Sequence, residues 1–118
     1  MTHLIKNVLI HKAARKVILE WPESIRKDLG SLLTVLQKGH NLGYPDVDSM
    51  SSVAPGCLEL RLKGPDGIYR AFYVVKSEFG ILVFHCFQKK TQVTPHKEIE
   101  TAKKRLRKFL EELKDEKD

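Results

Sequence analysis

The stretch GILVFHCFQKKTQVTP, residues 80–95, decides the fold that we expect for this chain. Its segment 81–87 is almost wholly apolar and is rich in β-branched and aromatic side chains, which predicts a buried central strand. Lys89 and Lys90 follow, and the Thr-Pro pair at the end is typical of a helix start. A cationic strand end is a common place for a functional site, because the strand fixes the geometry while the loop beyond it carries the chemistry.

The segments on either side predict a three-stranded antiparallel meander and three helices. Residues 58–63 alternate apolar and polar side chains, and a Gly-Pro-Asp-Gly turn leads into a returning strand. Two earlier segments with apolar residues three and four apart predict helices, which Trp21-Pro22 joins as a helical hairpin. The expected elements are a strand over 4–10, helices over 11–19, 22–38 and 95–113, a long loop over 40–57, and strands over 58–63, 68–75 and 81–87.

The length of 118 residues is that of one small domain, which we expect to span 1–118. The expected fold class is α+β, with the helical hairpin and the C-terminal helix packed on a curved, mainly antiparallel sheet. The chain is 42% hydrophobic and 8% aromatic, as is typical of a folded globular protein. Its net charge of +6 favours an acidic partner, either nucleic acid or an acidic protein.

Several classes of protein are disfavoured by the same sequence. No apolar run is long enough to span a membrane, and the first ten residues lack the pattern of a signal peptide, so we expect a cytoplasmic location. Two cysteines, Cys57 and Cys86, do not form a disulfide framework in a chain of this kind. No CxxC or HExxH spacing is present, so we predict no metal site and no cofactor.

The first hairpin is expected to place two arginines face to face. If residues 64–67 form a four-residue turn, Arg61 lies directly opposite Arg70. Like charges in this position weaken a sheet, so an anion held between them would account for the arrangement. Arginine suits this role because its planar fork matches phosphate and its charge is permanent. The alternative is that each arginine pairs with a carboxylate, of which Glu59 is the nearest in sequence.

The second hairpin extends this pattern toward the lysines. With residues 77–80 as the turn, Arg70 lies opposite Phe87, and Lys89 follows one alternation later on the same face. A cationic groove beside an aromatic ring is a typical site for single-stranded nucleic acid. Phe87 is therefore either a platform for a base or, as the more common alternative, a core residue. His85 is interpreted as a core histidine in preference to a catalyst.

Such a site suits cleavage of RNA by its own 2′-hydroxyl. The reaction needs a base for the hydroxyl, positive charge near the developing oxyanion and an acid for the leaving oxygen, and it needs no metal. Two neighbouring arginines would disfavour the charged form of Lys89 and lower its pKa, which makes Lys89 the candidate base. Arg61 and Arg70 would stabilise the phosphorane, with assistance from Tyr69 or Gln92.

Four short sequence motifs, in this order and spacing, resemble those of a known protein family. They are ELR at 59–61, GIYRAFY at 67–73, HCFQKKTQ at 85–92 and TP at 94–95, and EI at 98–99 and Ala102 follow. Together with the order of elements, they resemble the RelE/ParE superfamily of toxins from bacterial type II toxin–antitoxin systems. The similarity is greatest to the HigB-like, phage-related branch, and it covers nearly the whole chain.

The resemblance implies a compact RelE-like fold and a specific activity. It implies a toxin that enters the ribosomal A site and cleaves translated mRNA with basic residues and no metal. It also implies a cognate antitoxin, often of helix-turn-helix type, with the toxin alone monomeric. The residues that correspond to the family's basic catalytic positions are Arg61, Arg70 and Lys89, and the expected RNA-binding residues are Lys63, Tyr69, Lys90 and Gln92.

Two other functions stay open. The C-terminal stretch contains no tyrosine, and its histidine, His96, lies at the expected start of the helix, so the general acid is unassigned. A ParE-like toxin would inhibit DNA gyrase without catalysis. A module of the same fold would bind RNA or an antitoxin and cut nothing.

Overall fold

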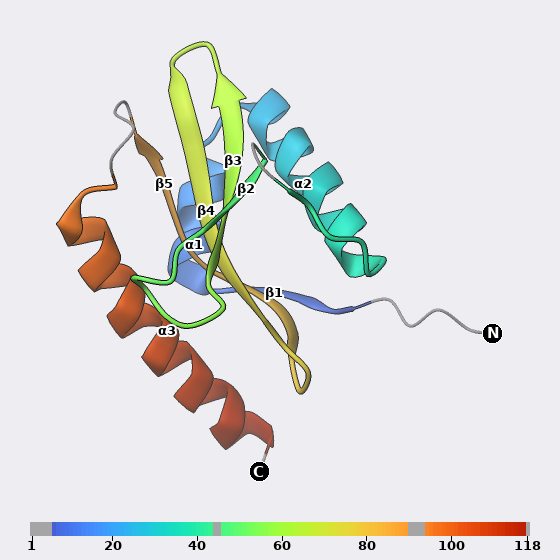
Figure 1. Cartoon of the computed structure of the whole chain (residues 1–118), viewed down its shortest axis with the longest axis vertical. Coiled ribbons are helices and arrows are strands. Elements are labelled where there is room, and N and C mark those ends of the chain that lie inside the picture. The colour runs from blue at the N-terminus through green and yellow to red at the C-terminus, as the bar shows by residue number, and fades with distance from the viewer. Residues whose placement is uncertain (1–5, 44–45, 90–93, 118) are drawn as a thin grey trace.

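The computed structural model describes residues 6–43, 46–89 and 94–117, and its architecture confirms the α+β fold class (Figure 1). The expected N-terminal strand, helical hairpin, meander and C-terminal helix are all present, and one short strand, β2, is added at an edge of the meander. The elements in chain order are β1 (Val8–Ile10), α1 (Lys12–Leu19), α2 (Glu23–Gln37), β2 (Val47–Ser49), β3 (Leu58–Gly64), β4 (Gly67–Lys76), β5 (Gly80–Lys89) and α3 (His96–Lys117).

The strands form one open sheet in the order β1-β5-β4-β3-β2. All neighbours are antiparallel except β1, which runs parallel to β5. The prediction of a continuous loop over 40–57 is wrong at β2, whose residues Val47–Ser49 pair with Leu58–Leu60. A three-residue edge strand takes its hydrogen bonds from a partner distant in sequence, so its own residues carry little strand pattern.

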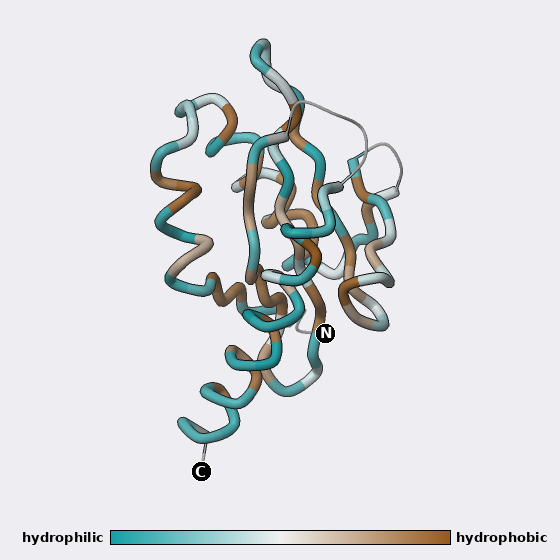
Figure 2. The backbone as a smooth tube through the Cα atoms, turned by 90° about the vertical axis from the view of Figure 1, so that its left-hand side faces the viewer, coloured by the Kyte–Doolittle hydropathy of each residue, from teal (hydrophilic) through white to brown (hydrophobic). Residues whose placement is uncertain are grey.

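The sheet separates two apolar cores. On one face, α1 and α2 pack on inward residues of the sheet such as Leu60, Ala71 and Val83. On the other face, α3 packs through Ala102, Leu106 and Phe109 onto a second set, which includes Phe72, Leu82 and Phe84. Brown and teal segments alternate along the helices in Figure 2, as expected for helices that bury one side. Successive residues of each strand therefore face different helices.

The β4–β5 hairpin reaches its predicted register by a different route. Lys76 pairs with Gly80, so the turn is one residue shorter than expected. The register then shifts between Phe72 and Tyr73, where β5 holds an extra residue in a β-bulge. The two differences cancel, and beyond the bulge Arg70 pairs with Phe87 as predicted. Within the described part of the chain, none of the helices is long and apolar enough to cross a membrane.

Candidate functional site

The two arginines of the meander lie directly opposite each other, as the turn predicts. Arg61 of β3 pairs with Arg70 of β4, and Arg70 pairs in turn with Phe87 of β5. Phe72, two residues after Arg70, belongs to the core under α3, so strand alternation assigns the arginines to that face. The predicted convergence of β3, β4 and β5 side chains on one face is confirmed for Arg61, Arg70 and Phe87.

A buried carboxylate joins the two arginines. Glu59 Oε1 accepts hydrogen bonds from Arg61 Nε at 2.9 Å and from Arg70 Nη1. Glu59 and Arg70 are each only 1% exposed. A buried charge is tolerated only when it is paired, so Glu59 explains why the sheet accepts facing arginines. The carboxylate alternative to a bound anion is therefore confirmed, and Arg70 is closed off from solvent in this structure.

A second carboxylate reaches Arg61 from the sheet edge. Asp48 Oδ2 of β2 lies 3.4 Å from Arg61 Nη2, and the side chains of Arg61 and Asp48 are 21% and 46% exposed. The Arg61 amide also donates to the Asp46 carbonyl at 2.8 Å, which holds β2 against β3. The formal charges of Arg61, Arg70, Glu59 and Asp48 cancel, so this cluster, which we call the arginine cluster, is neutral.

The arginine cluster also contains buried polar atoms that have no hydrogen-bond partner among the residues that the structure describes. Within the described part of the chain, Glu59 Oε2 and Arg70 Nε form no hydrogen bond. Such atoms are few in native proteins and are often found at strained or functional positions. Both belong to the Glu59–Arg70 pair, so the buried charges of this pair are only partly compensated by hydrogen bonds.

The predicted lysine end of the site is described only through its backbone. Ile68 pairs with Lys89, one alternation beyond Arg70 and Phe87, so the backbone of Lys89 is where the hairpin register predicts it. The side chain of Lys89, together with Lys90 and Gln92, lies outside the described residues. Lys63 is exposed near the end of β3.

Two aromatic side chains that were considered as RNA contacts, Tyr69 and Phe87, are buried. Tyr69 is 2% exposed and belongs to the core under α1 and α2, on the face opposite Arg70. Its ring meets Trp21 edge-on at 5.2 Å, and its hydroxyl donates to Asp66. Adjacent residues of a strand point to opposite faces, which corrects the expectation that Tyr69 reaches RNA beside Arg70. Phe87 is 9% exposed and packs in the core under α3, as the alternative for it predicts.

His85 is a core histidine, as expected, with both ring nitrogens bonded. Arg105 Nη1 of α3 lies 2.8 Å from His85 Nδ1, and Glu98 Oε1 lies 2.8 Å from His85 Nε2. An arginine can only donate, so Nδ1 accepts and Nε2 carries the proton that is donated to Glu98. Burial lowers the pKa of His85, against the opposing effect of the Glu98 hydrogen bond. The neutral ring ties α3 to the sheet and does not serve as an exposed acid.

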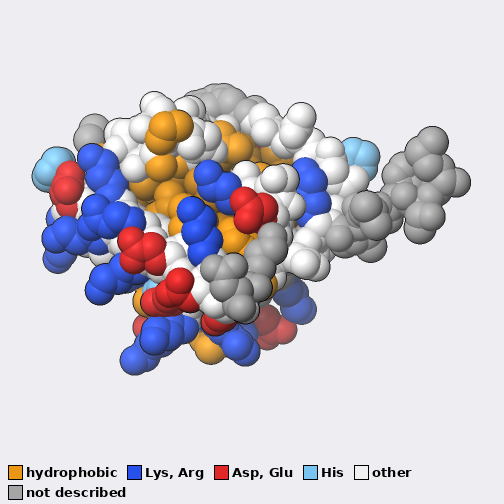
Figure 3. All heavy atoms as spheres, turned by 90° about the horizontal axis from the view of Figure 1, so that it is seen from below, with side chains coloured by type: hydrophobic (Ala, Val, Ile, Leu, Met, Phe, Trp, Pro, Cys, Tyr) orange, Lys and Arg blue, Asp and Glu red, His pale blue; other side chains and the backbone are white. Residues whose placement is uncertain are grey.

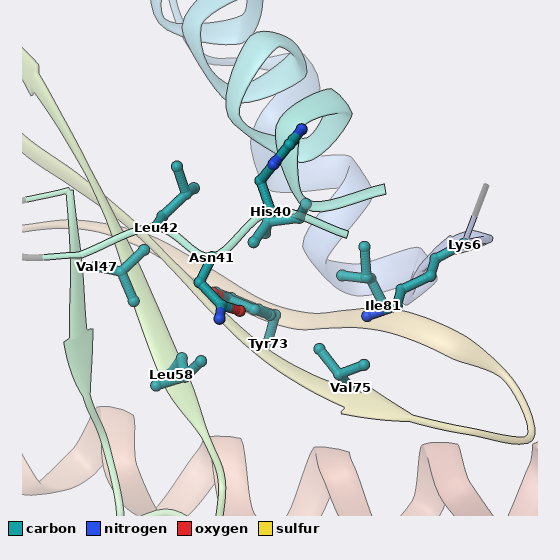
Figure 4. Close-up of a pocket in the computed structure, with 10 residues that line it drawn as sticks. Lys6, His40, Asn41, Leu42, Val47, Leu58, Tyr73, Val75 and Ile81 are labelled. Carbon is teal, nitrogen blue, oxygen red and sulfur yellow. The ribbon is translucent and has the colours of Figure 1, made fainter. Parts of the chain in front are cut away.

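A separate hollow of about 210 Å³ opens on the α2 side of the sheet (Figure 4). Its lining is mostly apolar and includes Leu36, Leu58, Tyr73 and Ile81, with His40 from the segment after α2. Nothing in the prediction of the site involves this hollow, and it lies on the opposite face from the arginine cluster. Among the described residues, no group of three or more His, Cys, Asp or Glu side chains is arranged to hold a metal ion.

The family model described as phage derived protein Gp49-like (DUF891) matches residues 16–107. The chain belongs to this family. It is a RelE/toxin-like family, and the matched range contains β3, β4, β5 and the arginine cluster. No curated protein and no solved structure gives a significant match to this Gp49-like chain.

Proposed function

We propose that this protein is the toxin of a toxin–antitoxin system and that it cleaves mRNA on the ribosome in the cytoplasm. The observation that supports the proposal is that Arg61 is partly exposed, is anchored by the buried Glu59, and lies across β4 from β5, the strand that ends at Lys89. The family supports a toxin and therefore an antitoxin partner. The helix-turn-helix type of that antitoxin, and a monomeric toxin before binding, are part of the proposal.

The structure changes the roles that we assign within the predicted site. Arg61 would contact the scissile phosphate, because its side chain is the exposed member of the arginine pair. Arg70 would be a positioning residue, acting through Glu59, because it is buried. Lys63, Lys90 and Gln92 stay candidates for RNA binding, whereas Tyr69 would support the hairpin.

Neutrality of the arginine cluster also bears on Lys89. The argument for a lowered lysine pKa needs uncompensated positive charge nearby, but Glu59 and Asp48 offset both arginines. We therefore assign Lys89 to charge stabilisation of the phosphorane in preference to general base. RNA would then rely on its 2′-hydroxyl and on positioning by the ribosome for much of the rate.

The neutrality of the arginine cluster also supports a second candidate function, binding without cleavage. A neutral arginine cluster with Arg70 buried is suited to holding structure as well as to catalysis. A module that binds RNA or antitoxin without cleavage would use Arg61 and the lysines as contacts only. The two functions differ in whether mRNA is cut.

Expression in bacteria separates these functions. The wild type would be induced beside Arg61→Ala/Lys89→Ala and beside a matched control, Lys27→Ala, which removes an exposed charge from α2. We expect growth arrest and new mRNA 5′ ends inside translated frames for the wild type and the control, and neither for the double variant. Arrest with intact mRNA and DNA damage would support gyrase inhibition instead. A folded protein that causes no arrest would support the binding module.

A further inference from the structure

Arg61 is held by two carboxylates whose surroundings differ. Glu59 is 1% exposed and is itself fixed by Arg70, so it cannot leave without stranding a buried cation. Asp48 is 46% exposed and meets Arg61 Nη2 at 3.4 Å, beyond a good hydrogen-bond length. Of these two contacts of Arg61, the one to Glu59 is therefore fixed and the one to Asp48 is easily exchanged.

The two carboxylates contact different nitrogens of the Arg61 guanidinium. Glu59 binds Nε, the inner nitrogen, at 2.9 Å, whereas Asp48 lies at Nη2, one of the two outer nitrogens. A phosphate binds arginine best through parallel hydrogen bonds from two nitrogens of the planar fork. An incoming phosphate would thus compete with Asp48 and leave the Glu59 contact intact.

We propose that Asp48 is a built-in competitor that occupies Arg61 until an RNA phosphate displaces it. The inference rests on the proposed function, in which Arg61 contacts RNA. It assigns Glu59 the role of orienting Arg61 and Asp48 the role of setting how tightly RNA must bind. Asp48 belongs to the edge strand β2, so the contact between Asp48 and Arg61 depends on the pairing of β2 with β3.

The test measures binding of a short, fluorescein-labelled single-stranded RNA to the full chain by fluorescence anisotropy. Asp48→Asn removes the competing charge with little change in shape. We expect binding about two- to five-fold tighter at low salt, as for loss of one exposed ion pair, and a smaller gain at higher salt. Asp28→Asn is the matched control, because it changes the net charge equally from an exposed site on α2.

Further variants separate the competition from a general charge effect. Asp48→Glu retains the carboxylate and should bind RNA like the wild type. In Arg61→Ala, which should bind RNA more weakly, adding Asp48→Asn should produce no more gain than Asp28→Asn does. A gain in binding cannot result from a loss of stability, so a purely structural role of Asp48 does not predict these results.

The outcomes distinguish the two proposals. If Arg61→Ala leaves RNA binding unchanged, Arg61 is no phosphate contact, and both the proposed site and the competition are wrong. If Arg61→Ala weakens binding while Asp48→Asn and Asp28→Asn have equal effects, the proposed site stands and the competition is refuted.

Discussion

Breaking the Glu59–Arg70 pair should be the most costly change of charge in the chain. Both side chains are buried, and a single variant would take Glu59 from Arg70 or one of its two arginines from Glu59. Glu59→Leu leaves the Arg70 cation in the core, and Arg70→Met leaves the Glu59 carboxylate with Arg61 alone. Loss of one partner of a buried ion pair costs about 3–5 kcal/mol, because the remaining charge is desolvated without compensation.

The double variant Glu59→Leu/Arg70→Met removes both charges and keeps the volume apolar. Replacement of a whole buried pair by hydrophobic residues is often neutral or stabilising by about 1–4 kcal/mol. We therefore expect the double variant to be more stable than either single variant. Arg61 should tolerate the change because it is partly exposed and also lies beside Asp48.

Urea unfolding followed by circular dichroism measures these differences. With a slope of about 2 kcal/mol per molar urea, typical of a small domain, a loss of about 3–5 kcal/mol should lower the midpoint by roughly 1.5–2.5 M. Single variants within about 1 kcal/mol of the wild type would contradict this prediction, since Glu59 and Arg70 would then not depend on each other. A double variant less stable than both singles would refute it as well.

Two further predictions concern the fold. The lowered pKa of His85 means that the unfolded chain binds the proton more tightly than the folded chain does. The free energy of unfolding should therefore fall as the pH drops below about 6.5, the ordinary pKa of histidine. Urea midpoints at pH 7.5 and 5.5 should differ less in His85→Gln than in the wild type, and an equal difference would contradict the assignment. Gly80→Ala should destabilise by more than about 1 kcal/mol, because Gly80 has φ +101° and a Cβ there would collide with the Asn7 carbonyl oxygen. Gly30→Ala on α2 is the control, with nothing within 4 Å of the added Cβ, and it should stabilise by about 0.5–1 kcal/mol; equal effects of the two glycine changes in thermal unfolding would count against the φ argument.

Much of the fold follows from patterns between residues close in sequence. The apolar spacing of α2 and the alternation of β3 each report on one element, and the turn at 64–67 sets the register of its hairpin. The pairing of Arg61 with Arg70 is therefore predictable. Its partner Glu59 is also within reach of sequence reasoning, since it lies two residues before Arg61 on the same face.

The electrostatic character of the site was not predictable in this way. Asp48 reaches Arg61 only because β2 pairs with β3, and Val47–Ser49 are too few residues to show a strand pattern. Arg70 is buried on the face of the sheet that packs against α3, and this packing joins segments distant in sequence. Alternation alone does indicate that Tyr69 faces away from Arg70, although this consequence is easily missed.

Local spacing and a short turn are enough to predict the helices, the meander, the facing arginines and the family resemblance. The burial of Arg70, the position of His85 between Glu98 and Arg105, and the neutral cluster that Asp48 completes are visible only in the folded chain. Burial and charge pairing depend on contacts between segments distant in sequence. A strand pattern shows which residues share a face but not what covers that face.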